Sequence, residues 1–156
     1  MSAEPVGLVI REEAYDSPTA QRLIAAVQQE YVERYGGPDE APVDPLEFAP
    51  PEGLFLVGYL DGQAAVTGGL RRHDAGDVEV KRMYVVPAAR GRGLARVMLA
   101  TLEERARTMG ARRIVLETGS KQPEAVRLYE TSGYQRIEGF GFYKCQPLSI
   151  SFAKVL

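Results

Sequence analysis

The sequence feature that most constrains the fold is an apolar run, followed by a turn rich in glycine and arginine and then by a helix-like pattern. The run covers residues 78–86 and stops at Pro87, and the turn at residues 90–93 reads Arg-Gly-Arg-Gly. Glycines weaken regular structure and clustered arginines repel one another, so this composition needs a physical reason. The start of a helix presents free backbone N–H groups, which bind anions with help from the helix dipole. The segment therefore predicts a strand–turn–helix unit that holds an anionic group.

The rest of the chain alternates strand and helix patterns. Apolar or alternating runs predict strands over residues 7–10, 54–60, 64–70, 78–86, 114–118 and 148–153. Helical spacing and stop signals predict helices over residues 18–35, 94–109 and 123–132. Asp61-Gly62 is a signal for a two-residue hairpin turn. This order predicts an α/β fold of the α+β type, with a mixed sheet, hairpins first and a right-handed crossover later.

The strand that leads into the turn changes phase in its middle. The apolar residues Val78 and Val80 are at even positions, whereas Met83 and Val85 are at odd positions, which in a regular strand point to the opposite face of the sheet. A bulge near Lys81-Arg82 would insert one residue and re-aim the later side chains. A central strand buried on both faces would explain the same run without a bulge, and the sequence leaves both interpretations open.

Length and composition limit the classes of protein to consider. With 156 residues, the chain suits one domain over residues 1–156. A net charge of −2 disfavours a nucleic-acid partner. The single cysteine, Cys145, and the single histidine, His73, rule out an internal disulfide and a metal site built on Cys and His. The N-terminal stretch lacks the basic region of a signal peptide, and no apolar run reaches the roughly 18 residues of a membrane span. We therefore expect a cytoplasmic protein without a membrane partner.

Two interpretations of the turn compete with a phosphate site. A charged surface loop would account for a turn. It would not explain why there are two glycines where one suffices, or why arginines that repel one another are clustered. A dinucleotide-binding fingerprint would use Gly91 and Gly93 and would place Glu117 near a ribose. The third glycine of that fingerprint is replaced by Arg96. A bulky side chain there blocks close packing of helix on strand, so the sequence disfavours a dinucleotide-dependent oxidoreductase.

The turn also carries a match to a known family. Arg90-x-x-Gly93-x-Ala95, after a strand that ends at residues 83–87, resembles the acyl-CoA-binding signature R/Q-x-x-G-x-G/A of the GNAT N-acetyltransferase superfamily. In that family the loop and the helix start hold the CoA pyrophosphate. The resemblance therefore implies that the anion at this helix start is a pyrophosphate.

A second match lies downstream, over residues 123–134. This segment resembles the family's later helix, N-x-x-A-x-x-L-Y-x-x-x-G-F, with four residues in register: Ala125, Leu128, Tyr129 and Gly133. Ala95 in place of the second glycine and Tyr134 in place of phenylalanine are ordinary variants. Gln122 stands where the family often has asparagine, which puts one side-chain contact to the donor in doubt.

The resemblance implies a GNAT-like fold and an acetyl-CoA-dependent acyltransferase. The fold would have a central mixed, mostly antiparallel sheet of about six to seven strands in three layers, flanked by helices. Acetyl-CoA would be the acyl-donor co-substrate, and no metal would be needed. The implied donor-binding residues lie at the strand end, the turn and two helix starts: Met83, Tyr84, Val85, Arg90, Gly91, Arg92, Gly93, Leu94, Ala95, Arg96 and Gln122.

Acyl transfer to an amine needs a proton donor for the leaving thiolate and a base for the amine. By the family match, Tyr129 is the candidate acid, because a phenol with a pKa near 10 is protonated at neutral pH. Its helical spacing is equally typical of a core aromatic residue. Glu79 and Glu117 are rival candidates for the base, and an ion pair with Lys81 or Arg82 is the structural alternative for Glu79.

The acceptor is the least constrained part of the reaction. The loop over residues 36–51 is rich in proline and acid, and it contains Asp39, Glu40, Asp44 and Glu47. These charges would attract a cationic amine, or would merely keep the loop solvated. We expect a primary amine of a small molecule or peptide, with a non-catalytic acyl-CoA-binding module as the alternative function. His73 and Cys145 have no partner close in sequence, which disfavours a covalent route. The family resemblance is the only ground for expecting a homodimer, because the sequence does not reveal the oligomeric state.

Overall fold

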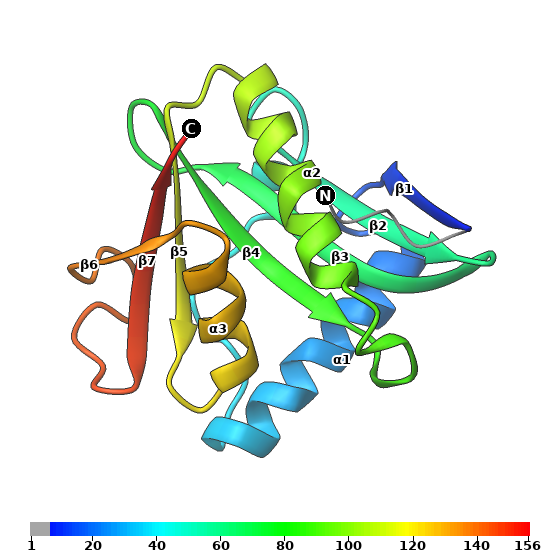
Figure 1. The fold of residues 1–156 in the computed structure, drawn as a ribbon, viewed down its shortest axis with the longest axis horizontal. Coiled ribbons are helices and arrows are strands. Elements are labelled where there is room, and N and C mark those ends of the chain that lie inside the picture. Colours follow the sequence, from blue (N-terminus) through cyan, green and yellow to red (C-terminus); the bar gives the residue numbers. More distant parts are fainter. Residues whose placement is uncertain (1–6) are drawn as a thin grey trace.

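The fold is a seven-stranded sheet with the strand order β1-β2-β3-β4-β5-β7-β6 (Figure 1). The computed structural model describes residues 7–156, so the first six residues of the stretch considered as a leader lie outside the described residues. Every neighbouring pair of strands is antiparallel except β4 and β5, which run parallel. The predicted mixed, mostly antiparallel α/β fold is confirmed. The elements are β1 (Leu8–Glu12), α1 (Pro18–Tyr35), the 3-10 helix η1 (Pro45–Phe48), β2 (Gly53–Leu60), β3 (Gln63–Arg72), β4 (Asp77–Val85), the 3-10 helix η2 (Pro87–Ala89), α2 (Leu94–Thr108), β5 (Arg113–Gly119), α3 (Pro123–Thr131), β6 (Gln135–Ile137) and β7 (Ser149–Val155).

Local signals account for the ends of the elements. Ser17 caps α1, since its hydroxyl accepts a hydrogen bond from the Ala20 N–H at 3.1 Å, and Pro18 occupies the first helical position. Gly36 ends the helix in the left-handed conformation. Asp61 and Gly62 both have positive φ, at 51° and 82°, as a tight hairpin turn between β2 and β3 requires.

The helices cover the two faces of the sheet. Helices α2 and α3 lie over one face, where Leu94, Met98 and Leu102 join a large apolar core. Helix α1 and η1 lie over the other face, where Val27 and Phe48 belong to a second core. Burying a side chain of this size stabilises the fold by roughly 1.5–3 kcal/mol, so the two cores hold the sheet from both sides. No helix in residues 7–156 is both long and apolar enough to span a membrane.

A bulge interrupts the pairing of β3 with β4, and it confirms one of the two interpretations of the phase change. Thr67 pairs with Tyr84 and Gly69 pairs with Lys81, so β4 carries one more residue than β3 between these pairs. Arg82 has a φ of 60°, which is uncommon for a residue other than glycine. The Thr67 hydroxyl donates a hydrogen bond to the Arg82 carbonyl at 2.7 Å and supports this backbone turn.

The parallel strands β4 and β5 part early. They are paired only between Asp77–Glu79 and Arg113–Val115, and beyond these residues they diverge, as Figure 1 shows. Their later residues therefore leave backbone groups unpaired within the sheet, and this divergence positions the site.

The C-terminal strand β7 differs from its predicted half-buried pattern. Phe152 is buried as predicted, but Ser151 and Ala153 are buried too, and Leu148 lies before the strand and is 44% exposed. The reason is that β6, a short strand that the sequence did not specify, pairs with the outer edge of β7 and places it inside the sheet.

Candidate active site

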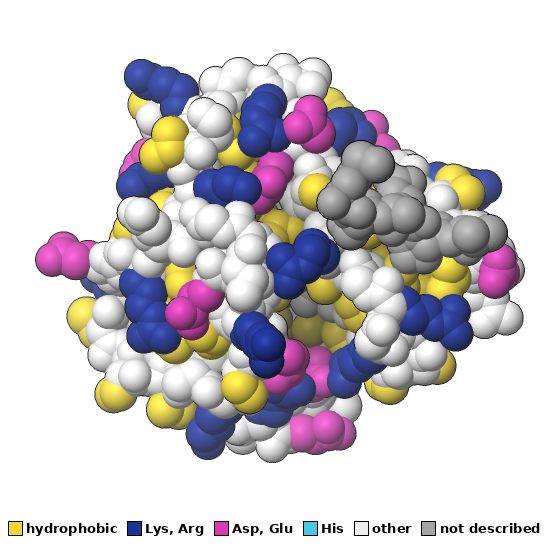
Figure 2. Space-filling view, viewed as in Figure 1, with side chains coloured by type: hydrophobic (Ala, Val, Ile, Leu, Met, Phe, Trp, Pro, Cys, Tyr) yellow, Lys and Arg dark blue, Asp and Glu magenta, His cyan; other side chains and the backbone are white. Residues whose placement is uncertain are grey.

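A cavity of about 410 Å³ opens where β4 and β5 diverge. Its walls come from the second half of β4, the start of α2, α3 and α1. On the face shown in Figure 2, a central hollow with an apolar floor is bordered by lysine and arginine side chains, with acidic side chains close by. The predicted donor residues that line the cavity are Met83, Tyr84, Val85, Arg90, Gly91, Gly93, Leu94, Ala95 and Gln122. Arg92 and Arg96 lie outside its lining.

The start of α2 offers unpaired N–H groups to this cavity. Gly93 precedes the helix with a φ of 76°, and no side chain caps the first turn. Gly91 has a φ of 82°, and a Cβ added at either glycine would meet no atom within 4 Å. The glycines thus serve the left-handed backbone of the turn and keep the helix mouth open. The first-turn N–H groups have no partner within the helix and are available to an anion.

Arg90 of the turn and Arg96 of the first turn of α2 take different partners. The Arg90 guanidinium donates to the Val85 carbonyl at 3.0 Å and pairs with Glu30 of α1 at 3.0 Å. Arg96 donates to the hydroxyls of Thr131 and Ser132 at the end of α3, at 2.9 and 3.0 Å. Arg90 therefore lies at the cavity rim, whereas Arg96 ties two helices together.

Tyr129 both packs in the core and lines the cavity. It is 5% exposed, and its ring contacts Tyr134 and Phe152 with centroid distances of 5.6 and 5.8 Å. It also lines the cavity, and its hydroxyl has no hydrogen-bond partner among residues 7–156. Burial, with a smaller contribution from Tyr31, raises the pKa of Tyr129 above its ordinary value, so the phenol stays protonated.

Glu79 is occupied by a structural ion pair. Its carboxylate accepts a hydrogen bond from Arg71 Nε at 2.9 Å, and Arg71 lies directly opposite on β3. The pair extends to Glu47, which contacts Arg71 at 3.1 Å. Glu79 is 5% exposed and does not line the cavity. The sequence predicted an ion pair of Glu79 with Lys81 or Arg82, whereas the structure pairs it with Arg71.

Glu117 on β5 has the opposite environment. It lines the cavity, and its Oε2 is buried without a hydrogen-bond partner among the described residues. Burial raises the pKa of the Glu117 carboxyl, and the charges of Glu79 and Asp39 raise it further, against the opposing effects of Lys81 and a hydrogen bond from the Tyr143 backbone. A carboxylate with a raised pKa in a cavity is suited to accept a proton near neutral pH.

A second cavity of about 360 Å³ adjoins the first. Both are lined by Tyr31, Asp39, Lys81, Glu117, Thr118 and Gln122, so Glu117 lies where the two meet. The Tyr35 hydroxyl donates to the Gln122 side chain at 3.1 Å, which fixes the residue that departs from the family's asparagine. The β6–β7 loop adds Tyr143, which no periodic pattern in the sequence pointed to; only its cluster of aromatic and glycine residues sets this loop apart.

The acidic loop is largely neutralised by its own contacts. Asp39 pairs with Lys81 at 3.0 Å and with Arg82 at 2.7 Å, and Glu47 pairs with Arg71. Asp44 caps η1 through the Leu46 N–H. Among these acids only Glu40 has an exposed carboxylate at the second cavity.

Neither His73 nor Cys145 belongs to this site. His73 packs edge-on against Phe140 at 5.0 Å between ring centroids, and Cys145 is exposed. Within residues 7–156, no group of three or more His, Cys, Asp or Glu side chains is arranged to hold a metal ion.

A mixed sheet whose parallel strands part beside an uncapped helix start is the arrangement expected of an acyl-CoA-dependent acyltransferase. Comparisons with known proteins place the chain within that class. Residues 21–134 match the profile of the Acetyltransferase (GNAT) family, and the chain belongs to this family. Its members transfer acyl groups from acyl-CoA to amines, so the chain is an acyltransferase and the dinucleotide interpretation of the turn is wrong.

Relatives support this assignment at the levels of sequence and fold. The chain is 33% identical over 149 residues to the IAA acetyltransferase of Azospirillum brasilense, covering 92% of this chain and 96% of that protein. It is 31% identical to a crystal structure from Klebsiella pneumoniae assigned as an acyl-CoA N-acyltransferase, with a TM-score of 0.81 and coverage of 96% and 97%. A GNAT family acetyltransferase of Elizabethkingia anophelis, crystallised with acetyl-CoA bound, shares the fold at 15% identity, with a TM-score of 0.70 and coverage of 97% and 100%.

Proposed function

We propose that the protein is an N-acetyltransferase that moves the acetyl group of acetyl-CoA to a primary amine of a small molecule or peptide, by direct attack in a ternary complex. The observation that carries this proposal is the Glu117 carboxylate at the junction of the two cavities, whose Oε2 is buried without a hydrogen-bond partner among the described residues. One cavity has the anion-binding helix start, and the other is free to hold an acceptor. The two substrates would therefore meet beside a group that accepts protons.

The donor would lie along β4 and end at the start of α2. The N–H groups of Leu94, Ala95 and Arg96 would bind the pyrophosphate, assisted by the helix dipole. The backbone of Met83 and Val85 would pair with the pantetheine, since the divergence of β4 from β5 leaves this edge unpaired. The Met83 N–H, just after the bulge, would polarise the thioester carbonyl.

The reaction then balances with two proton transfers. The amine nitrogen attacks the thioester carbon, and the new C–N bond forms as the C–S bond breaks. Glu117 takes the proton that the amine loses, directly or through a water molecule. Tyr129 gives a proton to the departing thiolate, which leaves as the CoA thiol. Glu117 then loses its proton to solvent and Tyr129 takes one up, which restores both groups. The two groups suit these roles because burial keeps the phenol protonated and raises the affinity of the carboxylate for a proton.

A panel of amines tests the proposed function. Purified protein is mixed with acetyl-CoA and with diamines, amino alcohols, aryl amines, amino acids or short peptides, and thiol release is followed against a blank without amine. We expect at least one class of amine to accelerate thiol release and to yield the N-acetyl product by mass spectrometry. The proposal fails if no amine raises the rate above the blank.

The helix start gives a separate prediction for donor binding. Ala95→Glu places a carboxylate in the first turn of α2, where it would repel the pyrophosphate but interact favourably with the helix dipole. We expect the Kd for acetyl-CoA to rise by about tenfold or more, a cost of about 1.4 kcal/mol, with an unchanged or higher Tm. Calorimetric titration and a thermal melt measure the two effects.

Ala100→Glu is the matched control, because Ala100 lies on the exposed face of the same helix. It adds the same charge away from the cavity and should leave acetyl-CoA binding unchanged. Equal affinities for the two variants would show that the anion does not bind at the start of α2.

The single domain over residues 1–156, the cytoplasmic location and a homodimer stay predictions. Light scattering during size exclusion chromatography measures the assembly state, and a mass of about 17.1 kDa would indicate a monomer.

A further inference from the structure

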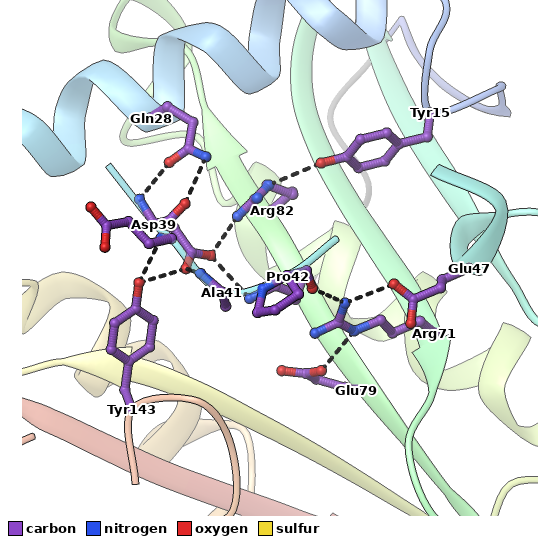
Figure 3. A network of polar contacts seen from close by, with 12 residues as sticks. Tyr15, Gln28, Asp39, Ala41, Pro42, Glu47, Arg71, Glu79, Arg82 and Tyr143 are labelled. Carbon is purple, nitrogen blue, oxygen red and sulfur yellow. Dashed lines mark hydrogen bonds and ion pairs between the residues drawn. The ribbon is translucent and has the colours of Figure 1, made fainter. Parts of the chain in front are cut away.

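Asp39 is bonded to more parts of the site than any residue that the sequence put forward as catalytic (Figure 3). It lies in the loop after α1, and its backbone is fixed to that helix by Gln28. The Asp39 N–H donates to Gln28 Oε1 at 2.7 Å, and Gln28 Nε2 donates to the Asp39 carbonyl at 3.2 Å. The position of the carboxylate is therefore set by α1 and not by the loop alone.

One side of the Asp39 carboxylate binds the bulge of β4. Its Oδ2 accepts from Arg82 Nη1 at 2.7 Å and from Lys81 Nζ at 3.0 Å. Arg82 is 6% exposed and holds a φ of 60°, so its charge and its backbone both need support from their surroundings. Tyr15 adds a contact to Arg82 Nε at 3.3 Å. The bulge determines the direction of the next residue, Met83, which lines the donor cavity.

The other side of the carboxylate binds the wall of the second cavity. The Tyr143 hydroxyl donates to Asp39 Oδ1 at 2.9 Å and accepts from the Glu40 N–H at 2.7 Å. The same loop covers Glu117, since the Tyr143 backbone hydrogen-bonds to its carboxylate and a Cβ at Gly141 would overlap Glu117 Oε1. Asp39 thus lies between the bulge on the donor side and the loop on the acceptor side.

We propose that Asp39 is a positioning residue that couples the two substrate sites: it holds the β4 bulge beneath the donor and the β6–β7 loop against Glu117, and it keeps the Lys81 ammonium away from the Glu117 carboxylate. This inference rests on the proposed function, because it assigns the two cavities to donor and acceptor. The charged groups that face Glu117 are Glu79 and Lys81 from β4 and Asp39 from the loop after α1. Asp39 stays ionised, since Lys81, Arg82 and the Ala41 N–H hold the pKa of its carboxyl far below its ordinary value despite burial.

Asp39→Asn tests the coupling with little change in shape. Removal of the charge ends the repulsion between Asp39 and Glu117 and releases Lys81 to pair with Glu117. Glu117 should then become a weaker base, so the acid limb of the pH profile of kcat/KM should move to lower pH. We expect kcat at neutral pH to fall about 10- to 100-fold, the size of effect seen when reacting groups are displaced. A residue that only supports folding would not shift the acid limb in this direction.

Asp44→Asn is the matched control. Asp44 is in the same loop and loses the same charge, but its carboxylate caps η1 and lines neither cavity. Its pH profile should stay that of the wild type. If Asp39→Asn folds and its kcat and acid limb equal those of Asp44→Asn, the proposal is overturned.

Tyr143→Phe decides the matter if Asp39→Asn does not fold. It removes the Tyr143 hydroxyl and with it the two acceptor-side hydrogen bonds, to Asp39 and from the Glu40 N–H, so we expect KM for the amine to rise while the Kd for acetyl-CoA stays constant. Its effect should also be less than additive with Asp39→Asn, because the two variants break one shared bond. An unchanged amine KM in Tyr143→Phe would overturn the coupling.

A titration of ¹³C-labelled glutamate by NMR separates the inference from the proposed function. In Asp39→Asn the pKa of Glu117 should be lower than in the wild type, whether or not an amine is turned over. A wild-type protein without amine turnover would refute the proposed function, whereas an unchanged Glu117 pKa in Asp39→Asn would refute this inference.

Discussion

Glu117→Gln is expected to lower kcat by roughly 10²- to 10⁴-fold, the range attributed to a positioned general base, with the Kd for acetyl-CoA unchanged. The side chain keeps its size but can no longer take the proton of the amine. Steady-state thiol release gives kcat, and calorimetric titration gives the donor affinity. The acid limb of the wild-type pH profile should be absent from the residual activity of the variant.

Glu79→Gln is the control for this substitution. It makes the same chemical change on the neighbouring strand, but it breaks the ion pair with Arg71 in place of a cavity contact. Arg71 keeps Glu47 as a partner, so the cost should be smaller than the about 3–5 kcal/mol of a buried pair whose remaining charge is left uncompensated. We therefore expect a lower Tm with most of kcat retained in the folded protein. The opposite result, with kcat lost in Glu79→Gln and kept in Glu117→Gln, would assign the base to Glu79.

The raised pKa of Glu117 also predicts the sign of its effect on stability. The folded state binds this proton more tightly than the unfolded chain, in which the pKa is about 4.3. Ionisation of Glu117 therefore lowers the free energy of unfolding. This loss of stability grows as the pH rises from the pKa of Glu117 in the unfolded chain through its pKa in the folded state. Glu117→Gln should equal the wild type in stability at acidic pH and match or exceed it at neutral pH. Urea unfolding at both pH values measures the difference.

The second large effect is expected for Tyr129→Phe. Loss of the hydroxyl removes the proton donor to the departing thiolate, and we expect kcat to fall by roughly 10²-fold or more with acetyl-CoA affinity nearly unchanged. Stability should change little, because this hydroxyl has no hydrogen-bond partner among residues 7–156 and the ring that packs in the core is retained. An unaltered kcat would exclude Tyr129 from the chemistry and leave it as a core residue.

Tyr134→Phe should show the reverse pattern. Tyr134 packs edge-on against Tyr129, but its hydroxyl donates to the buried Glu103 carboxylate at 2.8 Å. Its loss leaves that carboxylate with Lys154 as its remaining donor and should cost about 1–3 kcal/mol of stability. The activity of the folded protein should be unaffected. The two phenylalanine variants thus separate a hydroxyl used in catalysis from one used in folding.

The features that the sequence predicted well are those made by residues close together in the chain. Ser17-Pro18 and Gly36 bound α1, Asp61-Gly62 makes the hairpin turn, and Gly93 opens the α2 start. The first cavity follows from this kind of local geometry, since a strand, a glycine turn and a helix start supply much of its wall. The phase change in β4 was also a real signal, and it marks the bulge at Arg82.

Partners across the sheet could not be read from the chain. Glu79 pairs with Arg71 and not with its sequence neighbours Lys81 and Arg82, because antiparallel register places Arg71 directly opposite. Alternation along β7 suggested one buried face, but pairing with β6 placed the strand inside the sheet.

The sequence by itself therefore determined the GNAT architecture and the uncapped start of α2, and it proposed the short set of candidate residues that includes Tyr129 and Glu117. Only the tertiary structure separated Glu117 from Glu79 and brought Asp39 between the β4 bulge and Tyr143. The physical reason is that caps, turns and periodicity depend on neighbours along the chain. Burial and charge pairing, which set proton affinity, depend instead on strand register and on loops that meet across more than 100 residues, as Asp39 and Tyr143 do at a separation of 104.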